Sequence, residues 1–116
     1  MPREIWLDDQ YVSDETLPFV IAEIGHNHAG LVEKAIAMIR TAKIAGANAV
    51  KFQTRFPPDV YSVKEYNRVS DNPQWMSRQY GKHRELLEFT PEEWRDVFEA
   101  GKQERITVFA TPFDHK

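Results

Sequence analysis

The stretch that decides the fold is residues 19–53, FVIAEIGHNHAGLVEKAIAMIRTAKIAGANAVKFQ. It begins with Phe19–Ile24, a nearly continuous apolar run of the kind found in strands buried on both faces. From Leu31 to Ala45 apolar residues recur every three or four positions, which predicts an amphipathic helix ending at Gly46. Ala49–Gln53 is a second apolar strand. Strand, helix and strand in this order predict a right-handed βαβ unit with a parallel sheet.

The flanking sequence adds a hairpin in front of this unit. Ile5–Val12 alternates loosely around two aspartates, which predicts a short β-hairpin that could lie across the bottom of a barrel. Residues 13–18 are interpreted as a linker to the first buried strand.

A long excursion, residues 54–89, follows the second strand. Its prolines and its glycine argue against regular structure throughout, but aromatic residues such as Tyr61, Trp75 and Tyr80 argue against disorder, so we expect an ordered functional loop. Thr90, Pro91 and Glu93 then have the spacing of a helix start with a capping box. Thr107–Thr111 is a third strand, which ends before a proline. The order of elements predicts an α/β fold with a parallel sheet.

Length and composition limit the possible functions. The chain has 116 residues, and a complete (β/α)8 barrel needs about 250, so a barrel interpretation requires that most of the barrel is missing. With a net charge of −3, the chain as a whole offers no positive electrostatic potential that would attract nucleic acid or an anionic membrane. No cysteine is present for a disulfide or a thiolate nucleophile. The N-terminus lacks the apolar core of a signal peptide and no segment reaches a membrane span, so we expect a cytoplasmic protein.

Polar residues stand at the C-terminal ends of the predicted strands, namely Glu23, Lys51, Gln53 and Thr111. Residues two apart on a strand point to the same face, so Lys51 and Gln53 share a face opposite Val50. In a barrel, the C-terminal ends of different strands converge on one site. We therefore expect a carboxylate, an ammonium, an amide and a hydroxyl to meet there.

Purely structural interpretations of these residues remain open. Glu23 and Lys51 could form only a structural ion pair, and Thr111 could be a strand-end hydrogen bonder. In the loop after the first strand, Asn27 and His28 could contact a ligand. His26 with His28 would be an incomplete metal site, so no metal ligand is assigned. The basic residues of the excursion are expected to be solvated, and they are Arg68, Arg78, Lys82, His83 and Arg84.

Four motifs resemble one known family. The run Ala22–Gly30 resembles the A-E-I-G-x-N-H-x-G signature of N-acetylneuraminate (sialic acid) synthases and their legionaminate, pseudaminate and spore-coat relatives. Residues 45–53 are similar to its A-G-A-D-A-V-K-F-Q strand, residues 79–89 to its Y-G-x-H segment, and Thr111–Asp114 to its strand end S-T-P-F-D. The motifs occur in the family's order.

The resemblance implies the N-terminal portion, about three βα units, of a TIM barrel, preceded by a hairpin. Residues 1–116 would then be a fragment without the rest of the barrel and without the C-terminal antifreeze-like domain. The implied enzyme is a transferase that condenses phosphoenolpyruvate with an N-acetylated hexose such as N-acetylmannosamine, giving a nine-carbon α-keto sugar acid and phosphate. The implied cofactor is Mn²⁺ or Mg²⁺, whose ligands lie outside this chain, and the full-length protein is expected to be a homodimer.

The same resemblance implies roles for individual residues. Lys51 and Thr111 match positions that contact phosphoenolpyruvate, and Glu23 matches one beside the reacting carbons, where a carboxylate could orient or deprotonate water. Gln53, with Asn27 and His28, would face the sugar.

The sequence departs from the family pattern at some positions, and it leaves alternative functions open. Asn48 and Arg55 depart from the pattern and are expected at the edge of the site, where they could bear on substrate choice. The fragment alone is expected to be inactive. The alternatives are another phosphoenolpyruvate-condensing keto-sugar-acid synthase and a non-catalytic fragment or binding module.

Overall fold

A parallel sheet of three strands forms the centre of the molecule, which a computed structural model describes over residues 1–116. The strands β3 (Ile21–Gly25), β4 (Ala49–Thr54) and β5 (Thr107–Pro112) lie in the order β3-β4-β5. Both pairings are parallel, so the C-terminal ends of the three strands lie at the same edge of the sheet. The three predicted strands are confirmed. The first begins at Ile21, two residues later than predicted, and the backbone N–H of the preceding Val20 donates to the Asn48 side chain.

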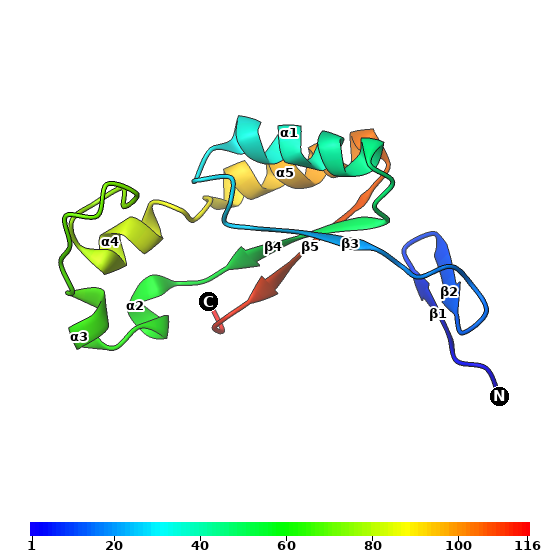
Figure 1. Cartoon of the computed structure of the whole chain (residues 1–116), viewed down its shortest axis with the longest axis horizontal. Coiled ribbons are helices and arrows are strands. Elements are labelled where there is room, and N and C mark those ends of the chain that lie inside the picture. Colours follow the sequence, from blue (N-terminus) through cyan, green and yellow to red (C-terminus); the bar gives the residue numbers. More distant parts are fainter.

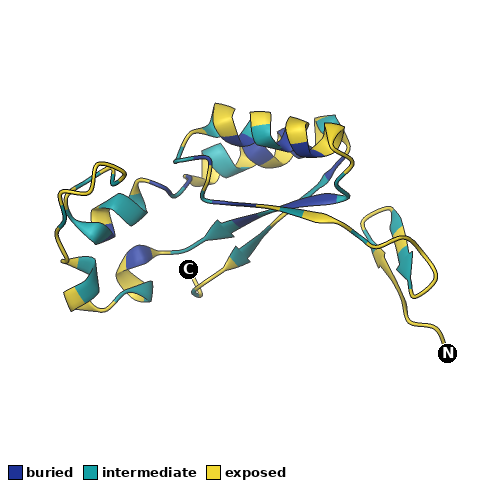
Figure 2. Cartoon of the chain, in the orientation of Figure 1, coloured by how far each residue is buried: buried dark blue, intermediate teal, exposed yellow.

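Two long helices, α1 (Val32–Ile44) and α5 (Pro91–Glu104), lie side by side over one face of the sheet (Figure 1). Val50 and Phe52 of β4 are fully buried beneath them, and Figure 2 shows the buried residues gathered between the helices and the sheet. The core is a single cluster, which also includes Ile24, Ala35, Ile39, Phe89, Val97 and Ile106. On the uncovered face Ile21 and Phe109 are 46% and 36% exposed, so the sheet is buried on one face only.

The helix ends follow the predicted signals. Thr90 Oγ1 accepts from the Glu93 backbone N–H at 3.2 Å, and Glu93 Oε2 accepts from the Thr90 N–H at 2.8 Å, which confirms the capping box. Gly46 follows the C-terminal cap of α1 with φ +92°, a conformation that costs glycine little. A β-carbon at Gly101 would lie 2.3 Å from Val108 Cγ2, so glycine lets α5 approach β5 closely.

The excursion between β4 and α5 is ordered by three short helices: α2 (Pro57–Val60), α3 (Val63–Tyr66) and α4 (Tyr80–Glu85). Its aromatic residues pack on one another and on cationic side chains. The guanidinium carbon of Arg68 lies 4.9 Å from the centre of the Trp75 ring and 4.7 Å from the centre of the Tyr80 ring. The Trp75 and His83 rings stack, with their centroids 5.6 Å apart. The expectation that the basic residues of the excursion are solvated is confirmed for Arg68, Arg78 and Lys82, which are exposed, and is wrong for His83 and Arg84, which are only partly exposed.

The N-terminal strands β1 (Glu4–Leu7) and β2 (Gln10–Ser13) pair antiparallel, and Trp6 packs on Tyr11 with ring centroids 5.3 Å apart. This hairpin lies at the N-terminal ends of the sheet strands, while the excursion lies at their C-terminal ends (Figure 1). No helix combines the length and the apolar character that a membrane span requires.

Candidate active site

Four polar side chains converge where the parallel strands end. Lys51 Nζ lies 2.8 Å from Glu23 Oε2 and donates to Thr111 Oγ1 at 2.8 Å. Gln53 Nε2 donates to the other oxygen of the same carboxylate, Glu23 Oε1, at 3.3 Å. One continuous polar line therefore crosses β5, β4 and β3. The sequence predicted that these four residues meet, and the contacts between their side chains confirm it, while their chemical roles stay predictions.

Strand geometry explains the convergence. Lys51 pairs with Glu23 across β3 and β4, and Gln53 pairs with Thr111 across β4 and β5. Their side chains alternate with the buried Val50 and Phe52, so they lie on the uncovered face. The pairing shifts by one residue at Gly25, whose φ of +57° suits glycine, and a β-carbon there would lie 3.3 Å from Glu23 Oε1. Glycine thus leaves room for the carboxylate.

Arg55 extends the polar line beyond the end of β4, a position that sequence reasoning placed only at the edge of the site. Its Nη2 donates to Gln53 Oε1 at 2.9 Å, and its Nη1 donates to the Tyr61 hydroxyl at 3.4 Å. The guanidinium carbon lies 4.2 Å from the centre of the Phe113 ring. The alternation of Lys51, Gln53 and Arg55 along the chain was the signal that could have included this arginine.

A buried polar cluster ties the loop after β3 to the end of β4. His26 Nε2 lies 2.9 Å from Glu88 Oε1, close enough for an ion pair but without hydrogen-bond alignment. Arg84 Nη2 lies 3.1 Å from His26 Nδ1, and this ring nitrogen accepts because a guanidinium can only donate. Glu88 Oε2 accepts from the Arg55 backbone N–H at 3.2 Å and from the Thr54 hydroxyl at 3.4 Å. Sequence reasoning missed the cluster because Arg84 and Glu88 belong to the excursion, far from His26 in the chain.

Asn27 and His28, predicted to face the sugar, do not join the polar line. Asn27 is exposed and its side chain donates to the Ile24 carbonyl at 2.9 Å. His28 is 1% exposed and stacks on Phe89 at 4.2 Å, while its Nδ1 accepts from the Gly30 N–H. Burial, with a smaller contribution from the nearby His26, lowers the pKa of His28 to about 4. His28 is therefore a core residue in its packing, on the helix-covered side of the sheet.

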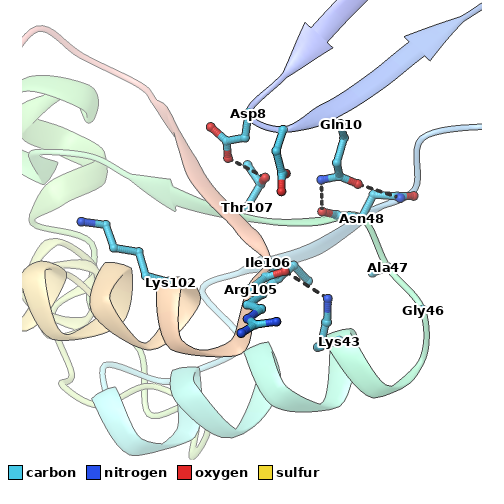
Figure 3. Close-up of a pocket in the computed structure, with 11 residues that line it drawn as sticks. Asp8, Gln10, Lys43, Gly46, Ala47, Asn48, Lys102, Arg105, Ile106 and Thr107 are labelled. Atoms are coloured by element: carbon cyan, nitrogen blue, oxygen red, sulfur yellow. Dashed lines mark hydrogen bonds between the residues drawn. The ribbon is translucent and has the colours of Figure 1, made fainter.

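Asn48 lies at the opposite end of the strands, so the expectation that it borders the site is wrong. A hollow of about 580 Å³ opens there between the hairpin and the C-terminal ends of α1 and α5 (Figure 3). Gln10 exchanges two 3.0 Å hydrogen bonds with Asn48, and Thr107 Oγ1 donates to Asp8 Oδ2 at 2.6 Å. Lys43 Nζ donates to the Arg105 carbonyl at 3.0 Å. The bonds to Gln10 and Asp8 attach the hairpin to the N-terminal ends of β4 and β5. The bond from Lys43 satisfies a carbonyl at the C-terminal end of α5.

Residues 1–116 contain no group of three or more His, Cys, Asp or Glu side chains that could hold a metal ion. His26 and His28 have ring centroids 5.7 Å apart, but one contacts Glu88 and the other is enclosed by aromatic rings. The side chains present therefore do not fit a divalent cation.

Comparisons with known proteins point in one direction. A family model described as "NeuB family" matches residues 38–116. N-acetylneuraminate-9-phosphate synthase of Mus musculus is 32% identical over 115 residues, which are 98% of this chain and 32% of that protein. Pseudaminic acid synthase of Campylobacter jejuni is 39% identical over 100 residues, which are 82% of this chain and 28% of that protein.

A solved structure agrees with these sequence relatives. The N-acetylneuraminic acid (sialic acid) synthetase of Leptospira borgpetersenii, in complex with citrate, matches with a TM-score of 0.75 and 32% identity. The match covers 98% of this chain and 35% of that one. This chain thus spans about a third of the length of the proteins that it matches here.

Proposed function

This chain belongs to the NeuB family, and from that premise we propose that it supplies the phosphoenolpyruvate side of a sialic-acid-synthase-type active site. The complete enzyme would condense phosphoenolpyruvate with an N-acetylated hexose such as N-acetylmannosamine, giving a nine-carbon α-keto sugar acid and phosphate. Relatives named as synthases of N-acetylneuraminate 9-phosphate and of pseudaminic acid support this reaction class. The single observation that carries the proposal is the Glu23–Lys51–Thr111 contact at the strand ends.

The proposed setting of this site is the interior of a (β/α)8 barrel, of which β3, β4 and β5 would be three strands. Helices cover only one face of the sheet, and the polar line lies on the other. Barrel enzymes carry their active sites at the C-terminal ends of the strands, which is where Lys51, Gln53 and Thr111 lie.

Lys51 is proposed to bind an acidic group of phosphoenolpyruvate. A lysine ammonium has three N–H donors, and Glu23 and Thr111 engage two of them. The third donor remains for a ligand oxygen. The side chain of Lys51 is 23% exposed, so a bound anion would meet a charge that is largely shielded from bulk water. The Thr111 hydroxyl accepts from Lys51, so its own proton is free to bind a second ligand oxygen.

Glu23 is proposed to act on water, with Gln53 beside it facing the sugar. The alkene carbon of phosphoenolpyruvate attacks the sugar aldehyde and forms the new C–C bond. Water then adds to the resulting oxocarbenium carbon, and Glu23 orients it or accepts its proton. Breaking the C–O bond to phosphate expels phosphate and leaves the keto group. Asn27 remains a proposed sugar contact because it is exposed, whereas the buried His28 gains no support for that role from its position.

A divalent cation in the complete enzyme would polarise the sugar aldehyde. The side chains of this chain do not form a cluster that could hold it, so no step is assigned to residues 1–116 through the metal.

The proposal is tested in a fusion, because the chain spans only about a third of its relatives. The segment of the Leptospira synthetase that aligns with this chain is replaced by this chain, and the fusion is given phosphoenolpyruvate, Mn²⁺ and N-acetylmannosamine. We expect phosphate release together with formation of the nine-carbon keto acid. The unmodified Leptospira protein is the positive control.

The matched negative control is the fusion with Glu23→Gln, which keeps a hydrogen-bonding side chain of the same size and removes the carboxylate. A correctly folded fusion that releases no phosphate would contradict the proposed function. Full turnover by the Glu23→Gln fusion would contradict only the role given to Glu23.

A further inference from the structure

The segment that joins α4 to α5 docks closely on the loop that follows β3. A β-carbon at Gly30, whose φ is +77°, would lie 2.3 Å from the carbonyl oxygen of Leu86, so a larger residue would not fit there. Two residues earlier in the loop, the His28 ring stacks on Phe89 at a centroid distance of 4.2 Å. The loop is therefore a platform that fixes where this segment lies.

Glu88 belongs to the docked segment and joins it to two other elements. One carboxylate oxygen, Oε2, accepts from the Arg55 backbone N–H at 3.2 Å and from the Thr54 hydroxyl at 3.4 Å. The other oxygen, Oε1, lies 2.9 Å from His26 Nε2. The side chains of His26 and Glu88 are only 9% and 15% exposed, so these contacts form in a low-dielectric setting that strengthens them.

The end of β4 needs such a partner because β3 stops short of it. β3 pairs with β4 only as far as Phe52, whereas β5 continues along Gln53 and Thr54. Beyond Phe52 one edge of β4 has no strand beside it, and a backbone N–H at that edge needs another acceptor. The Glu88 carboxylate supplies this acceptor for Arg55.

A carboxylate suits this position because acceptors are needed on two sides of it. His26 Nδ1 accepts from Arg84, so the ring carries its proton on Nε2 and presents a donor to Glu88. The Arg55 backbone N–H is the donor on the other side. A carboxylate has acceptors on both of its oxygens, whereas an amide would accept on one side alone.

These contacts lie behind the polar line of the strand ends and not in it. Thr54 alternates with Gln53 along β4, so the hydroxyl that Glu88 binds points toward the helix-covered face. Glu88 therefore holds the strand from the side opposite to the side chains that are proposed to meet substrate. Gln53 and Arg55 flank Thr54, so the placement of both depends on this anchor.

We propose that Glu88 is a positioning residue, which fixes the end of β4 and thereby holds the Gln53 side chain against Glu23. Gln53 donates to Glu23 Oε1 at 3.3 Å and accepts from the Arg55 guanidinium at 2.9 Å, so displacement of the strand end would alter both bonds. His26 secures Glu88 from the other side. The proposal rests on the proposed function only where it takes Gln53 to face the sugar.

The first test follows the 116-residue chain by NMR and needs no substrate. Glu88→Met keeps the length of the side chain and removes both acceptors. We expect the Arg55 amide to exchange with solvent at least about tenfold faster, since a hydrogen bond to a charged group contributes on this scale, and the Gln53 side-chain amide signals to shift. Glu88→Gln should give a smaller change in the same direction, and it decides the matter if Glu88→Met does not fold.

Glu85→Met is the matched control, because Glu85 lies nearby in the chain but its side chain bonds to Tyr66 and Lys82 instead of β4. It should leave both NMR readouts unchanged. Unchanged readouts in a folded Glu88 variant would overturn the inference. An equal effect of Glu85→Met would also overturn it, because general loosening of the excursion would then explain the result.

The second test uses the fusion with the Leptospira synthetase. Glu88→Met should raise KM for N-acetylmannosamine about tenfold and leave KM for phosphoenolpyruvate unchanged, because Lys51 lies where strands pair with β4 on both sides. A rise in both KM values, or in neither, would overturn the inference. An unmodified fusion without activity would count against the proposed function alone, and the NMR readouts would then decide the positioning role.

Discussion

The two ends of the parallel sheet are both polar, but their polar groups serve different partners. At the N-terminal end, Asn48 bonds to the backbone of Val20 and to Gln10, and Lys43 bonds to a backbone carbonyl. At the C-terminal end, the side-chain contacts of Lys51 are with Glu23 and Thr111, which are themselves side chains. The polar groups at the first end complete the fold, whereas the contacts of Lys51 at the second end satisfy no backbone group.

This difference gives a criterion for separating structural from functional polar groups in the molecule. A side chain that satisfies a buried or strand-end backbone group stabilises the fold, because that backbone group would otherwise lack a partner. The ion pair between Lys51 and Glu23 contributes little net stability, because the cost of withdrawing the Lys51 charge from water offsets the attraction. Lys51 and Glu23 therefore need another reason to be there, and binding of an acidic substrate supplies one.

The strongest test of this contrast is a matched pair of lysine substitutions, one at each end. In the fusion enzyme, Lys51→Met should lower kcat/KM for phosphoenolpyruvate about 1,000-fold, or about 4 kcal/mol, because it removes a preorganised donor to an anion. Lys43→Met should leave kcat/KM unchanged, since Lys43 contacts only the Arg105 carbonyl at the distant end. Steady-state kinetics on both variants decide the matter, and equal losses would show that the two ends are not functionally distinct.

The buried His28 should make stability depend on pH without depending on ligand. Its pKa is lowered from 6.5 to about 4 in the folded chain, so between these values the unfolded chain binds the proton more readily. The free energy of unfolding should therefore fall as pH decreases through this window, by about 3 kcal/mol at about 1.4 kcal/mol per pH unit. Urea unfolding from pH 7 to pH 4 measures the effect.

A His28→Phe variant is the control for this pH dependence, because it retains the stacking on Phe89 and cannot titrate. Carboxylates also titrate toward pH 4, so the informative quantity is the difference in slope between the two proteins. Parallel slopes would show that His28 is not the titrating group.

The sequence predicted the sheet because its signals were local. Apolar runs marked three strands, the period of the 31–45 segment marked α1, and Thr90 with Glu93 marked the start of α5. The sequence also predicted that Glu23, Lys51 and Thr111 lie close together, because the topology of a parallel sheet brings the C-terminal ends of its strands to one edge.

The rest depended on contacts that no local pattern encodes. The His26–Glu88–Arg84 cluster joins a loop to a helix through side chains about 60 residues apart in the chain. His28 looked like a ligand contact because it follows a glycine-rich turn, but the turn folds back and carries the ring into the core against Phe89. Tertiary packing sets the direction in which a loop side chain points, so the motif alone could not predict where the His28 ring lies.

A substitution at the structural end should affect stability alone. Asn48→Ala removes the acceptor of the Val20 N–H and the bond to Gln10, so we expect unfolding to become easier by about 2 kcal/mol. Asn48→Asp keeps an oxygen for Val20 and should lose less. Urea unfolding ranks the variants, and NMR titration with phosphoenolpyruvate should give the same affinity for both. Weaker binding in either variant would mean that the two ends communicate.

The smallest expected effect comes from two threonines that both lie near the C-terminal end of the sheet. Thr90 caps α5 by accepting from the Glu93 N–H, so Thr90→Val should cost about 1 kcal/mol of stability and leave phosphoenolpyruvate binding intact. Thr111 accepts only from the Lys51 side chain, so Thr111→Val should weaken binding with little change in unfolding. Urea unfolding and NMR titration on both variants complete the test. If the two threonines behave alike, location at this end decides function; if they differ as expected, the identity of the bonded partner decides it.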